Sequence, residues 1–232
     1  MPVEQLLALA LLAGVVGLDV VSFPQAMVSR PIVAATLGGA FLGDAIAGLV
    51  TGAALECLAL ESLPVGASRY PEWGSASVVA GAVATRGVAD GALPSPGAFA
   101  VAVVVGIATA WLAGWTVVKQ RQRIAAYARP RIGRLAEGDR DTVVAIQLVG
   151  MTIDLARGTG LGLLIAPPAW WLAGLVEERW TLPEPLSRAL VVTAVAAVAA
   201  AAVWKDFHAI SGTRRLFLLS LALGTALVIL GA

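Results

Sequence analysis

Residues 32–60 decide the fold of this chain; they read IVAATLGGAFLGDAIAGLVTGAALECLAL. This apolar run is longer than the about 20 residues that one upright membrane-spanning helix needs, and too short for two full ones. Two GxxxG patterns, which begin at Gly39 and Gly48, favour close approach between helices. Asp44 stands near the middle of the run. We expect two short helices that meet near Asp44–Gly48 as a hairpin inside the protein; the alternative is one long, tilted helix.

The composition agrees with a membrane protein. Hydrophobic residues make up 59% of the 232 residues and charged residues 13%, against roughly half and a quarter in soluble domains. A soluble core of this size could not bury so much apolar surface, whereas lipid accepts it. These values exclude a soluble enzyme, and basic residues without an aromatic platform exclude a nucleic-acid binder. We therefore expect a multi-pass protein of the inner (cytoplasmic) membrane, embedded in the lipid bilayer.

Further apolar segments flank this run. Ser75–Ala89 is too short to cross a membrane, and Pro96–Val118 is the clearest span. Val143–Val176 is interrupted by glycines and by Pro167-Pro168, so we expect a broken helix there. The remaining candidates are Leu6–Val21, Ala189–Trp204 and Leu216–Leu230. The expected fold class is all-α, a polytopic membrane protein with broken or re-entrant helices and an internal pseudo-repeat.

The distribution of charge predicts domain organisation and orientation. Residues 1–232 are expected to form one permease domain, with an N-terminal part (1–118), a basic loop (119–141) and C-terminal helices (142–232). Seven Lys and Arg residues against three acids place the 119–141 loop in the cytoplasm by the positive-inside rule. The acidic segment Glu177–Arg188 then lies on the opposite side of the membrane.

Several ionisable residues stand among apolar ones, where each costs on the order of 2.5–3.5 kcal/mol to insert. Such groups pair with one another or line a substrate path. Asp154 and Arg157 are spaced i, i+3 and are expected to neutralise each other. Asp19 and Arg30 either lie at membrane boundaries or pair together. Glu56, surrounded by Leu and Cys, is the strongest candidate for a functional carboxylate.

No sequence motif supplies chemistry of its own. The chain has no P-loop, no HExxH and no nucleophile elbow, so no catalytic residue, metal site or cofactor is expected. The single Cys57 excludes a disulfide within the chain and is interpreted as a small packing residue. The single His208 is expected in a solvated loop.

Residues 30–44, RPIVAATLGGAFLGD, resemble the signature RP-(I/L)-(V/I)-x-x-x-L-x-G-x-x-L-G-D of enzyme IIC subunits. The family is the mannose/fructose/sorbose branch of the phosphoenolpyruvate-dependent sugar phosphotransferase system. The match continues without a gap through Glu56 in G-x-x-x-G-x-x-L-E, and through Val65-Gly66-Ala67 and Pro71-Glu72. Asp19 and Gln25 resemble the acid and the glutamine that precede the signature. The detailed likeness covers residues 17–85.

The resemblance implies a permease subunit that binds a hexose or related sugar and moves it inward. Its implied partners are a IID membrane subunit and cytoplasmic IIA and IIB proteins, the last of which phosphorylates the sugar, within an oligomer. The implied substrate-binding residues are Glu56, Gln25, Asp19, Gly66 and Ala67. Arg30, Asp44, Asp154 and Arg157 are expected to be structural polar residues. The IIC subunit itself carries no phosphohistidine.

Two departures from the family pattern leave alternatives open. Pro64 stands where the family has an Asn, and Glu61 where it has a Gly, while Arg69 and Tyr70 replace small apolar residues. Losing the amide removes a hydrogen-bond donor and an acceptor from the implied sugar site. The sugar is therefore different, or the chain is a membrane scaffold without sugar phosphorylation. A third hypothesis is a donor-independent carrier that uses Asp44 and Glu56.

Overall fold

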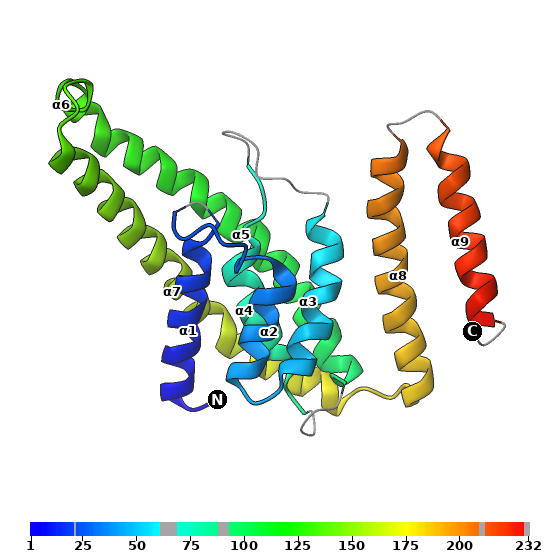
Figure 1. The fold of residues 1–232 in the computed structure, drawn as a ribbon. Helices are drawn as coiled ribbons and strands as arrows, with labels where there is room; N and C mark the ends of the chain where they lie inside the picture. Colours follow the sequence, from blue (N-terminus) through cyan, green and yellow to red (C-terminus); the bar gives the residue numbers. More distant parts are fainter. Residues whose placement is uncertain (21, 61–68, 88–92, 209–211, 230–232) are drawn as a thin grey trace.

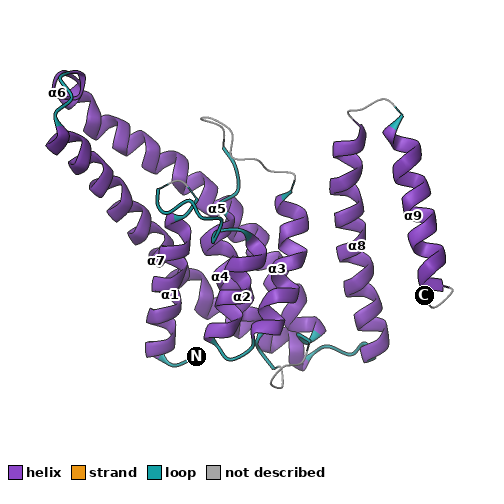
Figure 2. Ribbon diagram, viewed as in Figure 1, coloured by secondary structure: helices purple, strands orange, loops and turns teal. Residues whose placement is uncertain are grey.

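The computed structural model describes residues 1–232 except 21, 61–68, 88–92, 209–211 and 230–232. Its described residues are mostly helical and contain no β-strand (Figure 2). The elements in chain order are α1 (Val3–Leu18), α2 (Pro31–Phe41), α3 (Ala45–Ala59), α4 (Trp73–Ala84), α5 (Pro96–Ala128), the 3-10 turn η1 (Arg129–Arg131), α6 (Ile132–Ala136), α7 (Arg140–Glu178), α8 (Glu184–His208) and α9 (Thr213–Ile229). The expected all-α polytopic class is confirmed, whereas the internal pseudo-repeat stays a prediction.

The hairpin expected within residues 32–60 is present as α2 and α3. The break lies at residues 42–44, at the early end of the predicted position, and Gly43 has a φ of +99°, which a residue with a side chain rarely adopts. Asp44 caps α3, because its carboxylate accepts a hydrogen bond from the Ala47 N–H at 2.9 Å. Asp44 is only 6% exposed, so the acid lies inside the protein, as expected.

The second GxxxG pattern explains why α2 and α3 pack so closely. A Cβ on Gly48 would lie 2.3 Å from the Ala35 carbonyl oxygen, and a Cβ on Gly52 would lie 2.7 Å from that of Pro31. Only hydrogen atoms fit at these two positions, so the backbones of the two helices are in contact.

Helix α4 is the centre of the molecule. Every residue from Gly74 to Ala84 is buried, and the helix packs against α1, α2, α3, α5 and α7. At 12 residues it is too short to cross a bilayer, as the sequence predicted for this segment. A short helix can end inside a membrane protein because its neighbours and caps satisfy the free backbone groups.

Helices α5 and α7 form a long hairpin that differs from the predicted basic loop at 119–141. Helix α5 continues through Lys119 to Ala128, and η1 and α6 fill most of the turn (Figure 1). The run KQRQRIAAYA contains good helix formers and no glycine, so its charges do not end the helix. Asp139 caps α7, and a hydrogen bond from the Thr142 hydroxyl holds the pKa of Asp139 below its usual value.

The prediction of a broken helix over Val143–Val176 is wrong. Helix α7 continues without interruption over 39 residues, through Pro167 and Pro168. Its glycines serve packing instead. A Cβ on Gly158 would lie 2.8 Å from the Gly14 Cα of α1, and one on Gly162 would lie 2.8 Å from the Ala10 Cα. The small residues therefore bring α7 against α1 without breaking α7.

Helices α8 and α9 stand beside this body (Figure 1). Helix α8 packs against α3 and α5, and Trp204 of α8 meets Phe217 of α9 edge to face at 5.2 Å between ring centroids. Among the helices of the described ranges, three are long and apolar enough to cross a membrane: Pro96–Ala136, Arg140–Glu178 and Pro185–Trp204.

The basic and acidic connections between the helices lie at opposite ends of the molecule (Figure 1). The α6 turn, the end of α8 and the start of α9 lie at one end of the molecule, and the α7–α8 connection lies at the other (Figure 1). Single cysteines at Glu137 and Leu182, each in a Cys57→Ala background, should therefore label from opposite sides of the membrane with an impermeant thiol reagent. Both positions are exposed. Labelling of both from one side would contradict the predicted orientation.

Candidate functional site

A small pocket of about 80 Å³ lies between the start of α2, the end of α3 and the two segments that precede α2 and α4. Its polar groups come from Ser29, Arg30, Tyr70 and Trp73. Hydroxyl, guanidinium, phenol and indole groups can donate hydrogen bonds, and the two rings offer apolar faces. The remaining lining residues are Val20, Pro31, Ala59 and Pro71.

Arg30 and Glu56 form an ion pair at the edge of this pocket. Arg30 precedes α2 as its N-cap, and Glu56 lies in the last turn of α3, so the hairpin brings together residues 26 positions apart. The second oxygen of the Glu56 carboxylate accepts a hydrogen bond from the Ile32 N–H at 3.2 Å. The side chains remain 38% and 18% exposed, so the pair is accessible to a ligand.

Asp19 organises the chain between α1 and α2. Its carboxylate accepts hydrogen bonds from the Ala26 N–H at 2.6 Å, the Ser29 N–H at 2.9 Å and the Ser29 hydroxyl at 2.8 Å. Asp19 is 3% exposed. The acid therefore positions Ser29, which lines the pocket, and pairs with this loop instead of with Arg30.

A buried ionic network lies behind the pocket. Arg157 donates to Asp154 at 2.7 Å and to Glu72 at 3.3 Å, and both carboxylates are fully buried. Its Nε also donates to Gln120 at 3.1 Å. The expected pairing of Asp154 with Arg157 is confirmed, and Glu72 is a third member. Burial of such a group is tolerable only with its partners in place.

The network joins the segments on both sides of the pocket. Glu72 caps α4 by accepting from the Ser75 N–H at 3.0 Å, and Ser22 donates to Asp154 at 2.9 Å. The Arg121 guanidinium donates a hydrogen bond to the Tyr70 hydroxyl and lies 5.1 Å from the Tyr70 ring centroid. The segment after α1 and the start of α4 are thereby fixed against the inner parts of α5 and α7.

The structure brings together only part of the implied sugar site. Glu56 and Arg30 meet at the pocket, and Asp19 reaches it through Ser29. Gln25 lies exposed on the loop with a φ of +60°. Gly66 and Ala67, with Glu61 and Pro64, lie outside the described residues. Asp44 is at the opposite end of α3 from Glu56, so these two acids do not share a site.

Sequence reasoning missed four side chains of this region. Ser29, Tyr70 and Trp73 line the pocket, and Gln120 joins the buried network. The capping role of Glu72, the third acidic or basic member of the buried network, has a partial signal in the sequence. An acid three residues before Ser75, at the start of an apolar run, is typical of a helix N-cap. The other contacts join segments far apart in the chain, and no local pattern predicts them.

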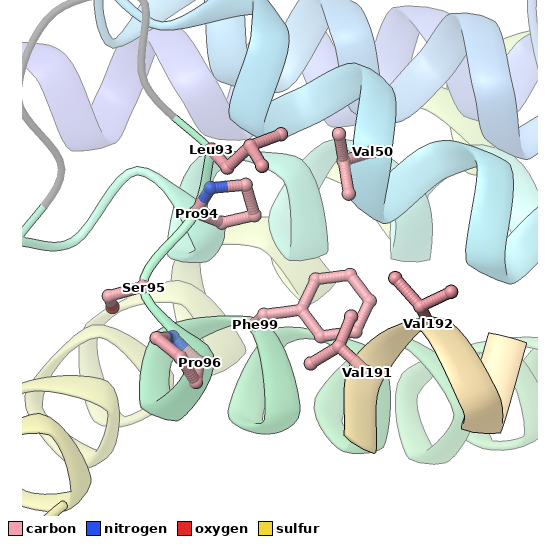
Figure 3. A pocket seen from close by; sticks show the side chains of 8 residues that line it. All are labelled: Val50, Leu93, Pro94, Ser95, Pro96, Phe99, Val191 and Val192. Carbon is pink, nitrogen blue, oxygen red and sulfur yellow. The ribbon is translucent and has the colours of Figure 1, made fainter. Parts of the chain in front are cut away.

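A larger cavity elsewhere is unsuited to a sugar. It encloses about 340 Å³ between α3, α5 and α8 and contains none of the predicted site residues (Figure 3). Leu93, Phe99 and Val191 point into it, and the Ser95 hydroxyl points away (Figure 3). That hydroxyl is used at the start of α5, where it accepts from the Ala98 N–H at 3.4 Å. An apolar wall of this kind cannot satisfy sugar hydroxyls.

Comparison with known proteins gives a family. The sequence model of the PTS system sorbose-specific IIC component matches residues 3–167. A search of curated protein sequences gives no significant match. A solved structure described as "Structure of membrane protein" is similar with a TM-score of 0.69 and 19% sequence identity, over 100% of this chain and 93% of the other. At that identity the likeness shows the fold alone. The family match spans most of the chain, through α1 to the middle of α7, and the chain belongs to the family of sorbose-specific IIC components, membrane subunits of sugar phosphotransferase systems.

Proposed function

We propose that this chain binds a sugar and moves it across the inner membrane, and that a separate cytoplasmic IIB protein phosphorylates it. The chain itself supplies no catalytic group and no cofactor in this proposal. A IID membrane subunit completes the permease, and a IIA protein supplies the phosphoryl group to IIB. The observation that carries the proposal is the accessible Arg30–Glu56 pair at a pocket with further hydroxyl and aromatic groups.

The chemistry of the pair suits a polyhydroxylated ligand. A carboxylate accepts hydrogen bonds only, and a guanidinium donates only, so together they match hydroxyl groups that both donate and accept. Charge-assisted hydrogen bonds of this kind are about twice as strong as neutral ones. Tyr70 and Trp73 offer rings against which the apolar face of a sugar can pack.

The pocket has to open for this ligand. Sites for small molecules enclose roughly 300–1,000 Å³, against about 80 Å³ here. When the pair separates, sugar hydroxyls would donate to the Glu56 carboxylate and accept from the Arg30 guanidinium. Each charge would therefore keep a hydrogen-bond partner while the pocket opens. Asp19 then acts as a positioning residue through Ser29, and Gln25, Gly66 and Ala67 remain candidates for direct contact.

Replacing Glu56 tests the site. In cells that express the complete phosphotransferase complex, Glu56→Gln should reduce sugar uptake by about tenfold to a hundredfold, because hydrogen bonds to a charged group contribute about 1.5–3 kcal/mol. Glu137→Gln is the matched control, since Glu137 is an exposed acid at the tip of the α5–α7 hairpin. Uptake of labelled sugar is measured at equal membrane abundance of the variants. Equal uptake by Glu56→Gln and the control would remove Glu56 from the sugar path.

A second candidate function is a membrane scaffold that holds the other subunits without transporting sugar. It is favoured by the small pocket and by the fact that both Asp19 and Glu56 already have partners within the chain. Arg69, which replaces a small residue of the family, is exposed beside Tyr70. A scaffold predicts that the complex assembles and that Glu56→Gln leaves the growth of cells on every sugar unchanged.

A further inference from the structure

A second polar pocket lies between α5 and α7, away from the Arg30–Glu56 pair. It encloses about 460 Å³ and is lined by Trp115, Lys119, Gln120 and Arg123 of α5 and by Arg157 of α7, among others. Three of these side chains are cationic, and no acidic side chain lines the pocket. The site therefore favours an anion.

Two of the three cations have their charge available. Arg157 is neutralised by Asp154 and Glu72. Within the described part of the chain, neither Lys119 nor Arg123 takes part in an ion pair, and both are exposed. The Lys119 ammonium lies 5.8 Å from the centroid of the Trp115 ring. The two exposed cations give the pocket a positive rim, and the Trp115 indole adds an apolar ring to its lining.

The position along α5 places this rim at a membrane surface. Lys119 is the first charged residue of α5, 23 positions after Pro96, so it lies about 35 Å of helix rise from the start. That distance is close to the thickness of the hydrocarbon core, about 30 Å. Trp111 and Trp115 are exposed just before it, as in the aromatic belt at membrane interfaces.

We propose that this pocket binds the headgroup of an anionic phospholipid, with the phosphate between Lys119 and Arg123 and the acyl chains running past Trp115. Basic pockets between membrane helices on the cytoplasmic side are suited to such headgroups. Gln120 and Arg157 form the inner wall, and both belong to the buried network that fixes Glu72 at the start of α4. The bound lipid would thus stabilise the crossing of α5 and α7 behind the sugar pocket.

Native mass spectrometry of the purified full-length chain in detergent tests this site. Phosphatidylglycerol is compared with phosphatidylcholine of the same acyl chains and with inorganic phosphate. The test variant is Lys119→Gln/Arg123→Gln. The control is Arg129→Gln/Arg134→Gln, which removes the same charge from the same hairpin outside the pocket. Each cation near an anionic lipid contributes roughly a fivefold gain in affinity, so the test variant should bind phosphatidylglycerol about thirtyfold more weakly.

The proposal requires three results together. Wild type and control retain phosphatidylglycerol better than phosphatidylcholine, the test variant loses this preference, and inorganic phosphate neither binds nor competes at millimolar concentration. Equal loss in the control would show diffuse surface attraction and overturn the site. Competition by inorganic phosphate would show that the pocket binds a free anion and would overturn the proposal that its ligand is a phospholipid. Since no sugar is present, failure here leaves the proposed sugar site untouched.

Discussion

Arg157→Gln is expected to destabilise the protein by about 3–5 kcal/mol, because it leaves two buried carboxylates without their cation. Asp154 and Glu72 are both fully buried, and the Arg157 guanidinium is the cation paired with each of them in the described structure. Ser22 also donates to Asp154, and Ser75 donates to Glu72. These donors are neutral and cannot replace the positive charge of the guanidinium. Thermal and denaturant unfolding of the purified protein, followed by tryptophan fluorescence, measures the loss.

The triple variant Glu72→Gln, Asp154→Asn, Arg157→Met separates charge balance from the loss of a large side chain. Replacing all members of a buried ionic network by neutral groups is often close to neutral in stability. Gln can still accept a hydrogen bond from the Ser75 N–H and keep the α4 cap. We therefore expect the triple variant to be more stable than Arg157→Gln alone. A triple variant that is less stable than the single one would show that the network does not act through charge.

Gly81→Ala is the other substitution with a large expected effect. A Cβ at Gly81 of α4 would lie 2.0 Å from the Ala35 carbonyl oxygen of α2, and one at Gly38 would lie 2.1 Å from that of Val78. The two helices are in backbone contact in both directions, so neither can yield by moving a side chain. Overpacking of a core costs about 1–3 kcal/mol or more, and we expect at least about 3 kcal/mol here. The gain in helix propensity, roughly 1 kcal/mol, cannot offset it.

Gly160→Ala is the matched control for this prediction. Gly160 lies inside α7, and a Cβ there would meet no atom within 4 Å. The same substitution without the overlap should raise the free energy of unfolding by up to about 1 kcal/mol. Unfolding of both variants in the same detergent compares them directly. If Gly81→Ala is as stable as Gly160→Ala, α2 and α4 are not in backbone contact.

The sequence was sufficient for the α2–α3 hairpin because the signals for it are local. The length of the apolar run, its glycines and the acid at its middle all concern neighbouring residues, and Gly43 and Asp44 do make the turn. Charge and glycine content are poor guides to the helices in the second half of the chain. The charged run that begins at Lys119 predicts a loop, although its residues favour helix, and the glycines of α7 predict a break, although they pack against α1.

The candidate site was less predictable, because its contacts depend on how the helices pack. An acid among apolar residues indicates a functional role for Glu56. Its pairing with Arg30, however, depends on how α2 and α3 are aligned along each other, which no local pattern predicts. Glu72 and Arg157 are 85 positions apart, and only the three-dimensional arrangement of α4 and α7 joins them. The contacts of Asp19 with Ser29 likewise depend on the path of the loop between α1 and α2, whereas its contact with a sugar stays a prediction.

The most direct test of the proposed function is sugar uptake by vesicles that contain the reconstituted membrane complex, with the cytoplasmic IIA and IIB proteins enclosed. Labelled hexoses and related sugars are supplied outside, with phosphoenolpyruvate and the general phosphotransferase proteins present or absent inside. We predict that one sugar accumulates as its phosphate, that accumulation needs the phosphoryl donor, and that Glu56→Gln abolishes most of it. Equal entry of free sugar without the donor would indicate a donor-independent carrier. No uptake of any sugar by the assembled complex would indicate a scaffold, and either result would contradict the account.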